Sequence, residues 1–416
     1  MDGESRHSSM NGRPRLLVVP HVYAENISVR EIELAKRLTG TFDVFCLSWP
    51  DVLHVDGAPT LSRRLKQLRV GLESVFAPYR TRPGAKGMTI VQAPVLQSVL
   101  LHRLMGEKRA EAFTRSFNRG ALERVVRTHC ITHILLAAAT FKLPRISGVR
   151  GFLDVIDWFP EDVTSAQEAV TVRALFLESA NAAEGVFAAS EPLAEKLKND
   201  CGIDAVALPN GADLVDLRSV ASQRVASLRE RLGLAGKYVI GYIGNHGSYT
   251  GVDFAVKAFE AVRNRIPNAV LLIVGPAEFW RSLLEAKRGE GVVWTGPVAP
   301  AEIGTYFHAL DLGILAQEKS LFTELAFQIK IVEYSACRKF VISTPLQTWA
   351  RLKWPNVFLT PLEVDAWVEA IVRAKRSKWQ PEWDAEIEPY DWNALAGRMA
   401  AVLLNTGQRE EVVCVS

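Results

Sequence analysis

The sequence predicts an α/β protein made of two Rossmann-like domains that face one another across a cleft. Stretches typical of strands and of helices alternate along almost the whole chain, which is the pattern of parallel sheets covered by helices. The chain has 416 residues, more than one hydrophobic core usually covers. The alternation stops at residues 213–236, which are polar and basic, and then restarts. We therefore expect one domain on each side of this segment.

The first domain is predicted to span residues 15–212. Short apolar runs, most of them typical of buried strands, are separated in several places by predicted helices. One helix is well marked at about 29–38, because Ser28 and Glu31 have the spacing of a capping box and Gly40 stands where the helix should end. The predicted strands cover 16–19, 44–47, 89–92, 134–137, 152–156, 186–189 and 206–208.

The second domain is predicted to span residues 213–390. A turn signal, Pro209-Asn210-Gly211, precedes it, and a helix is expected at 252–265, where apolar residues keep helical spacing. The two halves share this architecture without any period at the level of residues, so we infer no sequence repeat. The predicted strands cover 238–243, 270–274, 292–295, 312–315, 340–343 and 357–359.

Composition disfavours several classes of protein. The net charge of +3 is small for this length, so a nucleic-acid partner is not expected. The five cysteines form no Cys-x-x-Cys pair, which favours reduced thiols and a cytoplasmic location. Residues 1–14 are expected to be a disordered tail, because they lack the apolar centre of a secretory signal. No apolar run approaches the roughly 18 residues of a membrane span.

The run from Phe327 to Ala336, FQIKIVEYSA, is the most informative segment of the chain. Lys330 and Glu333 share one face of the predicted helix. They stand near its start, where backbone amides favour a phosphate group, and a strand-like run follows at 340–343. The alternative is an ordinary solvated pair of side chains on a surface helix.

This run resembles the donor-nucleotide motif of the two-domain GT-B glycosyltransferases, bacterial sugar transferases among them, whose usual pattern is Pro-x-Lys-x-x-Glu-Tyr-x-Ala. The resemblance implies that Lys330 lies at the donor diphosphate and Glu333 at the ribose hydroxyls. The segment 241–247, GYIGNHG, resembles the glycine-rich loop of the same family. The donor-contacting residues that this second resemblance implies are Gly244, Asn245 and His246. For His246, the role of an ordinary turn residue is an equal alternative.

The chain departs from that family at three places, one of which is Thr250-Gly251, where the family often has Lys-Gly after the glycine-rich loop. Gln328 stands where the family usually has proline. The Glu-x7-Glu spacing common among retaining members is missing, because Leu325 occupies the position eight residues before the motif's glutamate and Glu324 the position nine before it. The anomeric outcome is therefore left open. We expect the donor sugar to meet Glu324 or the backbone around Phe322 and Thr323.

Two aspartates are the candidate bases. Asp154 and Asp157 lie at the carboxyl end of a predicted buried strand, where ligands of open parallel sheets collect. Such a carboxylate can accept the proton of an acceptor hydroxyl. We favour Asp157, because some inverting members of this architecture place an aspartate base at a similar strand end, and we keep Asp154 as the fallback. The alternative is that these carboxylates cap the helix that follows.

The acceptor side and the C-terminal end carry weaker signals. The segment 61–70 combines Arg63, Arg64, Lys66 and Arg69 with leucines, and arginines continue through 100–127. Such a surface suits anionic lipid and a lipid-linked sugar, and a solvated helix pair covering the sheet is equally compatible. A run that starts at Tyr390, YDWNALA, resembles the family's last helix. Residues 391–416 are therefore expected to return to the first domain.

These features predict a glycosyltransferase that moves a sugar from a UDP- or GDP-linked donor to a hydroxyl of a glycan or lipid-linked acceptor in envelope or exopolysaccharide biosynthesis. No two aspartates lie two residues apart, so the metal motif of single-domain GT-A glycosyltransferases is absent. We expect no metal and no cofactor, with Lys330 and helix-terminal amides facing the leaving diphosphate. The alternatives are a nucleotide-sugar 2-epimerase of the same fold and a non-catalytic sugar-nucleotide-binding protein.

Overall fold

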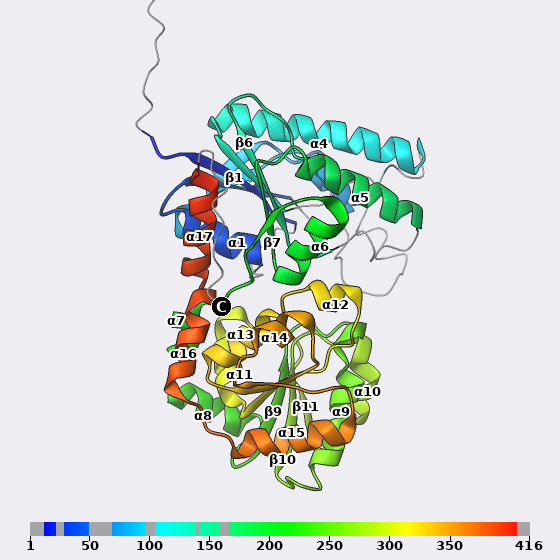
Figure 1. Cartoon of the computed structure of the whole chain (residues 1–416), viewed down its shortest axis with the longest axis vertical. Helices are drawn as coiled ribbons and strands as arrows, with labels where there is room; N and C mark the ends of the chain where they lie inside the picture. The colour runs from blue at the N-terminus through cyan, green and yellow to red at the C-terminus, as the bar shows by residue number, and fades with distance from the viewer. Residues whose placement is uncertain are drawn as a thin grey trace, which may run out of the picture.

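The computed structural model describes residues 12–21, 29–49, 69–96, 101, 105–137, 141–158 and 166–405. Two sheets made almost wholly of parallel strands, each flanked by helices, form two domains that lie one above the other along the long axis of the molecule (Figure 1). The predicted fold class is confirmed.

The sheet of the first domain has eight strands in the described part of the chain, in the order β3-β4-β2-β1-β5-β6-β7-β8. All seven predicted strands are present, and the sequence missed only β3, which pairs antiparallel with β4 at the sheet edge. The four residues of β3 are all exposed and end in proline, so they lack the apolar alternation that marks a strand. The strands are β1 (Arg15–Val19), β2 (Asp43–Ser48), β3 (Arg80–Pro83), β4 (Thr89–Gln92), β5 (His133–Leu136), β6 (Arg150–Val155), β7 (Gly185–Ala188) and β8 (Ala205–Ala207).

The sheet of the second domain is wholly parallel, in the order β11-β10-β9-β12-β13-β14. Strand β10 is buried at every position, as expected for a parallel strand with helices on both faces. The strand order reverses between β9 and β12, and ligands of such sheets bind at this reversal, beyond the carboxyl ends of the strands. All six predicted strands are confirmed: β9 (Tyr238–Ile243), β10 (Ala269–Val274), β11 (Val292–Trp294), β12 (Leu312–Leu315), β13 (Phe340–Ser343) and β14 (Val357–Leu359).

The helices that the argument uses lie around these sheets. In the first domain they are α1 (Arg30–Leu38), α4 (Glu107–His129), α5 (Ala166–Ala180) and α6 (Glu191–Cys201). In the second domain they are α7 (Leu214–Arg218), α8 (Ser222–Arg231), α9 (Val252–Val262), α10 (Arg281–Ala286), α11 (Ile303–Ala309), α12 (Leu321–Leu325), α13 (Ile329–Ala336), α14 (Gln347–Leu352), α15 (Val364–Arg376) and α16 (Asp384–Ile387). The last helix is α17 (Trp392–Leu404).

The start of α1 differs from the prediction. Its N-cap is Val29, and no side chain caps the helix there. Glu31 does not take part in a capping box, because its carboxylate accepts a hydrogen bond from the backbone N–H of His21 instead, at 2.9 Å. Ser28 lies outside the described residues. The helix itself is confirmed, because it ends at Leu38 and its C-cap, Thr39, directly precedes Gly40.

The chain passes between the domains twice, and the two passages pair with each other. The backbone N–H of Ala212 donates to Tyr390 O at 2.9 Å, and the N–H of Trp392 donates to Ala212 O at 3.1 Å. A Cβ on Gly211 would stand 2.6 Å from Tyr390 O, so a larger residue would push the passages apart. Beyond them, α17 lies beside α1 (Figure 1) and buries Leu395 in the first domain's core. The predicted return of the C-terminal helix is confirmed.

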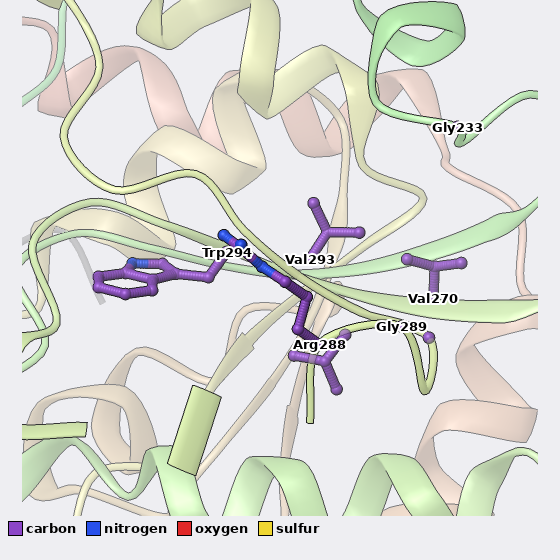
Figure 2. A pocket seen from close by; sticks show the side chains of 8 residues that line it. Gly233, Val270, Arg288, Gly289, Val293 and Trp294 are labelled. Atoms are coloured by element: carbon purple, nitrogen blue, oxygen red, sulfur yellow. The ribbon is translucent and has the colours of Figure 1, made fainter. Parts of the chain in front are cut away.

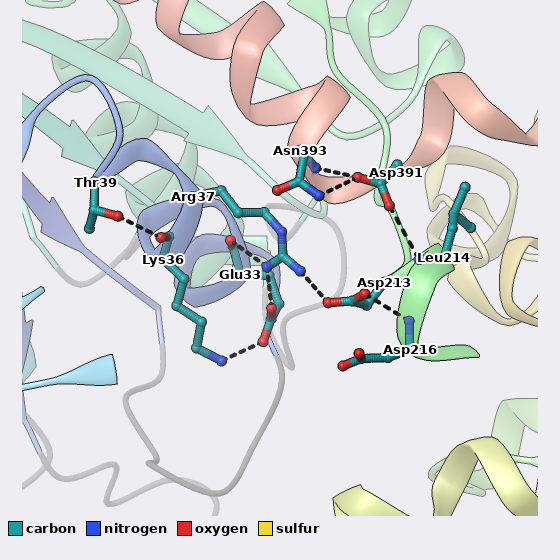
Figure 3. A network of polar contacts seen from close by, with 9 residues as sticks. All are labelled: Glu33, Lys36, Arg37, Thr39, Asp213, Leu214, Asp216, Asp391 and Asn393. Carbon is teal, nitrogen blue, oxygen red and sulfur yellow. Dashed lines mark hydrogen bonds and ion pairs between the residues drawn. The ribbon is translucent and has the colours of Figure 1, made fainter. Parts of the chain in front are cut away.

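A polar network holds this double passage to the first domain (Figure 3). Arg37 on α1 forms an ion pair with Asp213, Nη2 to Oδ2, at 2.6 Å. Asp213 also caps α7 through the N–H of Asp216, and Asp391 accepts from the N–H of Leu214 at 3.2 Å. Carboxylates from both passages are therefore tied to neighbouring backbone, which fixes the point at which the chain changes domain.

Candidate active site

The glycine-rich loop after β9 lies against the loop after β10. The backbone N–H of Gly244 donates to Val274 O at 2.9 Å. A Cβ on Gly275 would overlap the carbonyl oxygen of Gly244, and both glycines have positive φ, of 119° and 149° respectively. Only glycine allows this approach without strain. The half-buried backbone of Gly244 therefore lies at the reversal point of the second sheet without a side chain of its own.

Lys330 and Glu333 come together beside this loop, in the first turns of α13. A side chain on Gly244 would begin 3.5 Å from Lys330 Cε, so the lysine lies directly against the open loop. Its Nζ is 2.7 Å from Glu333 Oε2 and 5.6 Å from the centroid of the Phe307 ring. The Lys330 side chain is 27% exposed. A cation and the N-terminal amides of a helix thus meet at one accessible place, which suits a diphosphate.

His246, expected to contact the donor or to be an ordinary turn residue, is buried beneath the glycine-rich loop. It is only 2% exposed, and its Nε2 donates to Val274 O at 3.1 Å. Burial lowers the pKa of His246 to about 4, and the positive charge of Lys330 contributes to the fall. The ring also meets Tyr242 edge to face. His246 is therefore a neutral support beneath the loop, whereas Asn245 beside it is exposed.

The segment around α12 also lies near the glycine-rich loop. The hydroxyl of Thr323 donates to Glu318 O at 2.7 Å within the N-cap of α12, and its backbone N–H donates to Ser320 Oγ at 3.2 Å. The ring of Phe322 meets Tyr249, two residues after the glycine-rich loop, at 5.5 Å between centroids. Glu324 accepts from the N–H of Gln347 at 2.8 Å, so one of its carboxylate oxygens serves the first turn of α14.

Gln328 occupies the position of the usual proline, and its side-chain amide forms two hydrogen bonds there. Its Nε2 donates to Thr323 O at 2.8 Å, and its Oε1 accepts from Trp349 Nε1 at 2.8 Å. The buried amide therefore joins α12 to α14 across the turn that leads into α13. A side-chain clamp at this position holds the turn in front of Lys330.

The two candidate bases have different surroundings. Asp154 is buried at 1% exposure, and both of its oxygens accept from Arg30: Oδ2 from Nε at 3.0 Å and Oδ1 from Nη2 at 3.1 Å. Burial raises the pKa of Asp154, and the Arg30 guanidinium opposes that rise. A carboxylate enclosed in this way cannot touch an acceptor, so Asp154 is unsuited to the fallback role. Asp157 lies just beyond β6 and is half-buried.

Three titratable residues near Asp154 were missed by the sequence analysis. Arg30 and Glu31 open α1, and both are buried. His21, which follows β1, contacts Glu31 Oε1 through its ring Nδ1 as well as through its backbone N–H. In the sequence these three residues look like ordinary polar residues around a helix start. Only the fold brings them beside a strand end more than 100 residues away.

The pocket in Figure 2 is a different place. It has a volume of about 370 Å³ and lies along the edge strand β11, with Val270, Arg288 and Trp294 among its lining residues. None of the predicted site residues lines it. We assign the candidate site to the strand reversal point and not to this pocket.

Part of the predicted acceptor surface lies outside the described residues, namely Arg63, Arg64 and Lys66. Arg69 is described and forms an exposed ion pair with Glu73 at 2.8 Å. Across the described ranges, no helix is both long and apolar enough to cross a membrane.

Comparison with known proteins agrees with this geometry. Residues 237–376 match the family model described as Glycosyl transferases group 1. This match covers the whole second sheet together with the glycine-rich loop and α13. The similarity to the group 1 glycosyl transferases therefore lies in the second domain.

One sequence relative matches part of the chain, and two solved structures resemble it over nearly the whole fold. A 165-residue stretch is 28% identical to TuaH of Bacillus subtilis (strain 168), a glycosyltransferase assigned to teichuronic acid biosynthesis; it covers 38% of this chain and 41% of that relative's length. The sucrose-phosphate synthase of Thermosynechococcus elongatus has a TM-score of 0.67 at 15% identity, covering 94% of this chain and 98% of its own. HepE of Anabaena, in complex with UDP and glucose, has a TM-score of 0.60 at 16% identity, covering 94% and 96%. The whole chain thus has the two-domain GT-B fold of these solved structures, and its second domain matches the group 1 family model.

Proposed function

We propose that the protein transfers a sugar from a UDP- or GDP-linked donor to an acceptor hydroxyl. The observation that carries this proposal is the position of Lys330, whose ammonium group lies against the glycine-rich loop at the start of α13. A diphosphate leaving group gains negative charge as the sugar departs, and a preorganised cation with helix-terminal amides stabilises that charge. The HepE complex with UDP and glucose supports a nucleotide-sugar donor.

The donor is held, in this proposal, by groups of the second domain. Lys330 contacts the diphosphate, Glu333 turns from its ion pair with Lys330 to the ribose hydroxyls, and the sugar meets Glu324. The backbone of the α12 turn and the glycine-rich loop complete the site, through Phe322, Thr323, Gly244, Asn245 and the buried support His246. No metal or cofactor takes part.

The acceptor is activated from the first domain. We propose that Asp157 is the general base of an inverting transfer, because it stands at the strand end of the opposite sheet. The acceptor oxygen gives its proton to the carboxylate and forms a bond to the anomeric carbon. The bond from that carbon to the diphosphate oxygen breaks, and its electron pair leaves with the nucleotide.

The acceptor class is a glycan or lipid-linked intermediate of a cell-envelope polysaccharide. The assignment of TuaH to teichuronic acid biosynthesis supports such a pathway, and the basic stretch at 61–70 supports work in the cytoplasm at the inner membrane surface.

A donor panel tests the proposed function. Purified protein is incubated with UDP-glucose, UDP-N-acetylglucosamine and GDP-mannose, and the products are identified by chromatography and mass spectrometry. We expect slow release of free nucleotide from at least one donor, with water as acceptor. A change in the sugar of the intact donor would indicate a 2-epimerase, and binding without any reaction would indicate a sugar-nucleotide-binding protein. Either result would overturn the proposal.

A further inference from the structure

Arg30 is a buried cation that joins three separate parts of the chain. It is the first residue of α1, and its side chain is 3% exposed. The guanidinium holds Asp154 at the end of β6 through two oxygens. Its Nη1 donates to Pro209 O at 2.7 Å and lies 3.3 Å from Asn210 Oδ1, in the segment that leads to the second domain. One side chain thereby binds the acceptor-side strand end to the interdomain passage.

The contact chain continues into the second domain. Asn210 Nδ2 donates to Phe327 O at 3.2 Å, and Lys330 follows three residues later. A neighbouring bond supports the same turn, because the hydroxyl of Ser190, the N-cap of α6, donates to Leu325 O at 2.5 Å. The turn before α13 is therefore held by two side chains from outside its own domain.

Stability alone is a poor reason for this arrangement. Burying an ion pair removes two charges from water, and a well-packed apolar pair of the same volume is often as stable or more so. Group transfer supplies another reason, because reacting groups must be aligned closely, and a displacement of about 1 Å can lower the rate about 10²-fold. Asp157 lies three residues beyond Asp154, and Lys330 lies three beyond Phe327. The chain of contacts thus ends beside one functional group in each domain.

We infer that Arg30 is a positioning residue that sets the separation between the acceptor-side strand end and the donor-binding helix α13. This role rests on the proposed function. Arg30 itself touches neither substrate, and it acts through Asp154 on one side and through Asn210 on the other.

The test replaces the ion pair by an apolar pair, Arg30→Met with Asp154→Leu, so that no unpaired charge is left buried. We expect the double variant to fold with a melting temperature near that of the wild type. Nucleotide release from the best donor of the panel should fall about 10²-fold in kcat, while the Kd for UDP or GDP by calorimetry stays unchanged. A loss in kcat without a loss in nucleotide affinity is the signature of positioning, which a general structural defect would not produce.

A matched control is available at the surface. Arg351 on α14 and Glu195 on α6 form another ion pair between the domains, at 2.6 Å, with side chains 37% and 57% exposed. Arg351→Met should leave kcat near the wild-type value, because exposed ion pairs contribute little. If the double variant at Arg30 and Asp154 also keeps a kcat close to that of the wild type, the inference is overturned.

A second measurement separates this inference from the proposed function. Hydrogen exchange of the backbone amides in 325–333 needs no substrate, and we expect it to be faster in the double variant, although both substitutions lie in the first domain. If the wild-type protein turns over no donor, the proposed function fails, and exchange alone decides the coupling. Faster exchange supports the contact chain, and unchanged exchange contradicts it.

Discussion

The two halves of the candidate site use opposite electrostatic arrangements. On the donor side, the groups are backbone amides, glycines and a neutral buried His246, with the partly exposed Lys330 as the cation beside them. On the acceptor side, the charged side chains of Arg30, Glu31 and Asp154 are 3% exposed or less and contact one another or their neighbours. The donor-side ion pair of Lys330 and Glu333 is thus partly exposed and accessible to an anion, whereas the ion pair of Arg30 and Asp154 on the acceptor side is buried. We infer that the first domain chiefly positions the reacting groups, whereas the second chiefly stabilises the negative charge of the leaving group.

The same contrast explains what the family model matches. The donor side is local, because Lys330 and Glu333 belong to one helix and the glycines to two loops after neighbouring strands. The matched range of 237–376 contains all of these groups. The acceptor side depends on contacts such as Arg30 to Asp154, 124 residues apart, and its surface must suit an acceptor that differs from one enzyme to another. A local motif therefore identifies the second domain and not the first.

The largest expected effect comes from Asp157, on the acceptor side. Asp157→Asn removes the proposed base and should lower turnover by about 10²- to 10⁴-fold. Nucleotide affinity should stay nearly intact, because the donor is bound by the other domain. Steady-state kinetics and calorimetry check this pair of expectations, with Asp253→Asn, at an exposed carboxylate on α9, as the control.

The stereochemistry of the product sharpens this prediction. Inversion at the anomeric carbon, measured by NMR of the released sugar, is expected with a carboxylate base. Retention together with a nearly normal rate for Asp157→Asn would contradict the proposed mechanism. In that case the leaving phosphate itself would be the group that accepts the proton.

Lys330 should produce the next largest effect, on the donor side. Lys330→Ala removes a preorganised cation and should cost about 2 to 4 kcal/mol of transition-state stabilisation. Glu333→Ala should chiefly weaken nucleotide binding. Lys257→Ala, at an exposed ion pair on α9, is the control for a general loss of positive charge. Unchanged nucleotide affinity in both site variants would refute the assignment of the donor site.

The sequence was sufficient for the fold, and the structure brings the proposed donor-side residues Lys330 and Glu333 together beside the glycine-rich loop. Short apolar runs located the thirteen predicted strands, because parallel strands that are buried on both faces are continuously apolar in sequence. The edge strand β3 was missed because four exposed residues ending in proline carry no such signal. The capping box at Ser28 and Glu31 was wrong for a related reason. Sequence spacing shows which neighbours Glu31 can reach along its own helix. It does not show that the fold places the backbone N–H of His21 within hydrogen-bond distance of the Glu31 carboxylate.

The surroundings of several site residues depend on tertiary contacts that the sequence does not show. A glycine-rich loop with a histidine suggests an exposed tip, but β10 and its loop cover His246 and bury it. Gln328 looked like a defect in the motif, and its amide bonds to Thr323 and Trp349 became visible only in the structure. The pairing of Asp154 with Arg30 likewise depends on tertiary structure, because the sheet order brings the end of β6 beside the start of α1.

His246 predicts a smaller, pH-dependent effect on the donor side. Burial places the pKa of His246 at about 4 in the folded protein, below the value of about 6.5 for an unfolded chain. Between these values the unfolded state binds more protons, so the free energy of unfolding falls as the pH is lowered through this window. From pH 7 to pH 5, His246 should account for a loss of about 2 kcal/mol.

Urea denaturation of the wild type and of His246→Gln at both pH values checks this expectation. The loss of stability on acidification should be smaller in the variant by roughly that amount. Equal losses in the two proteins would show that His246 titrates as an exposed residue does, and the donor side would then not be the neutral surface described above.

Chelation should have the smallest effect on transfer, and the expected change is none. The chain has no Asp-x-Asp pair, and across the described ranges no three His, Cys, Asp or Glu side chains gather as a metal-binding group. If Lys330 and the N-terminal amides of α13 meet the charge of the leaving diphosphate, activity should persist after treatment with EDTA and removal of the chelate. Addition of magnesium or manganese should then change the rate little. An activity that vanishes on chelation and returns with either ion would show that Lys330 is not sufficient. The negative charge of the leaving diphosphate would then be stabilised by a metal cation bound together with the nucleotide. The comparison of the two domains would have to include that cation.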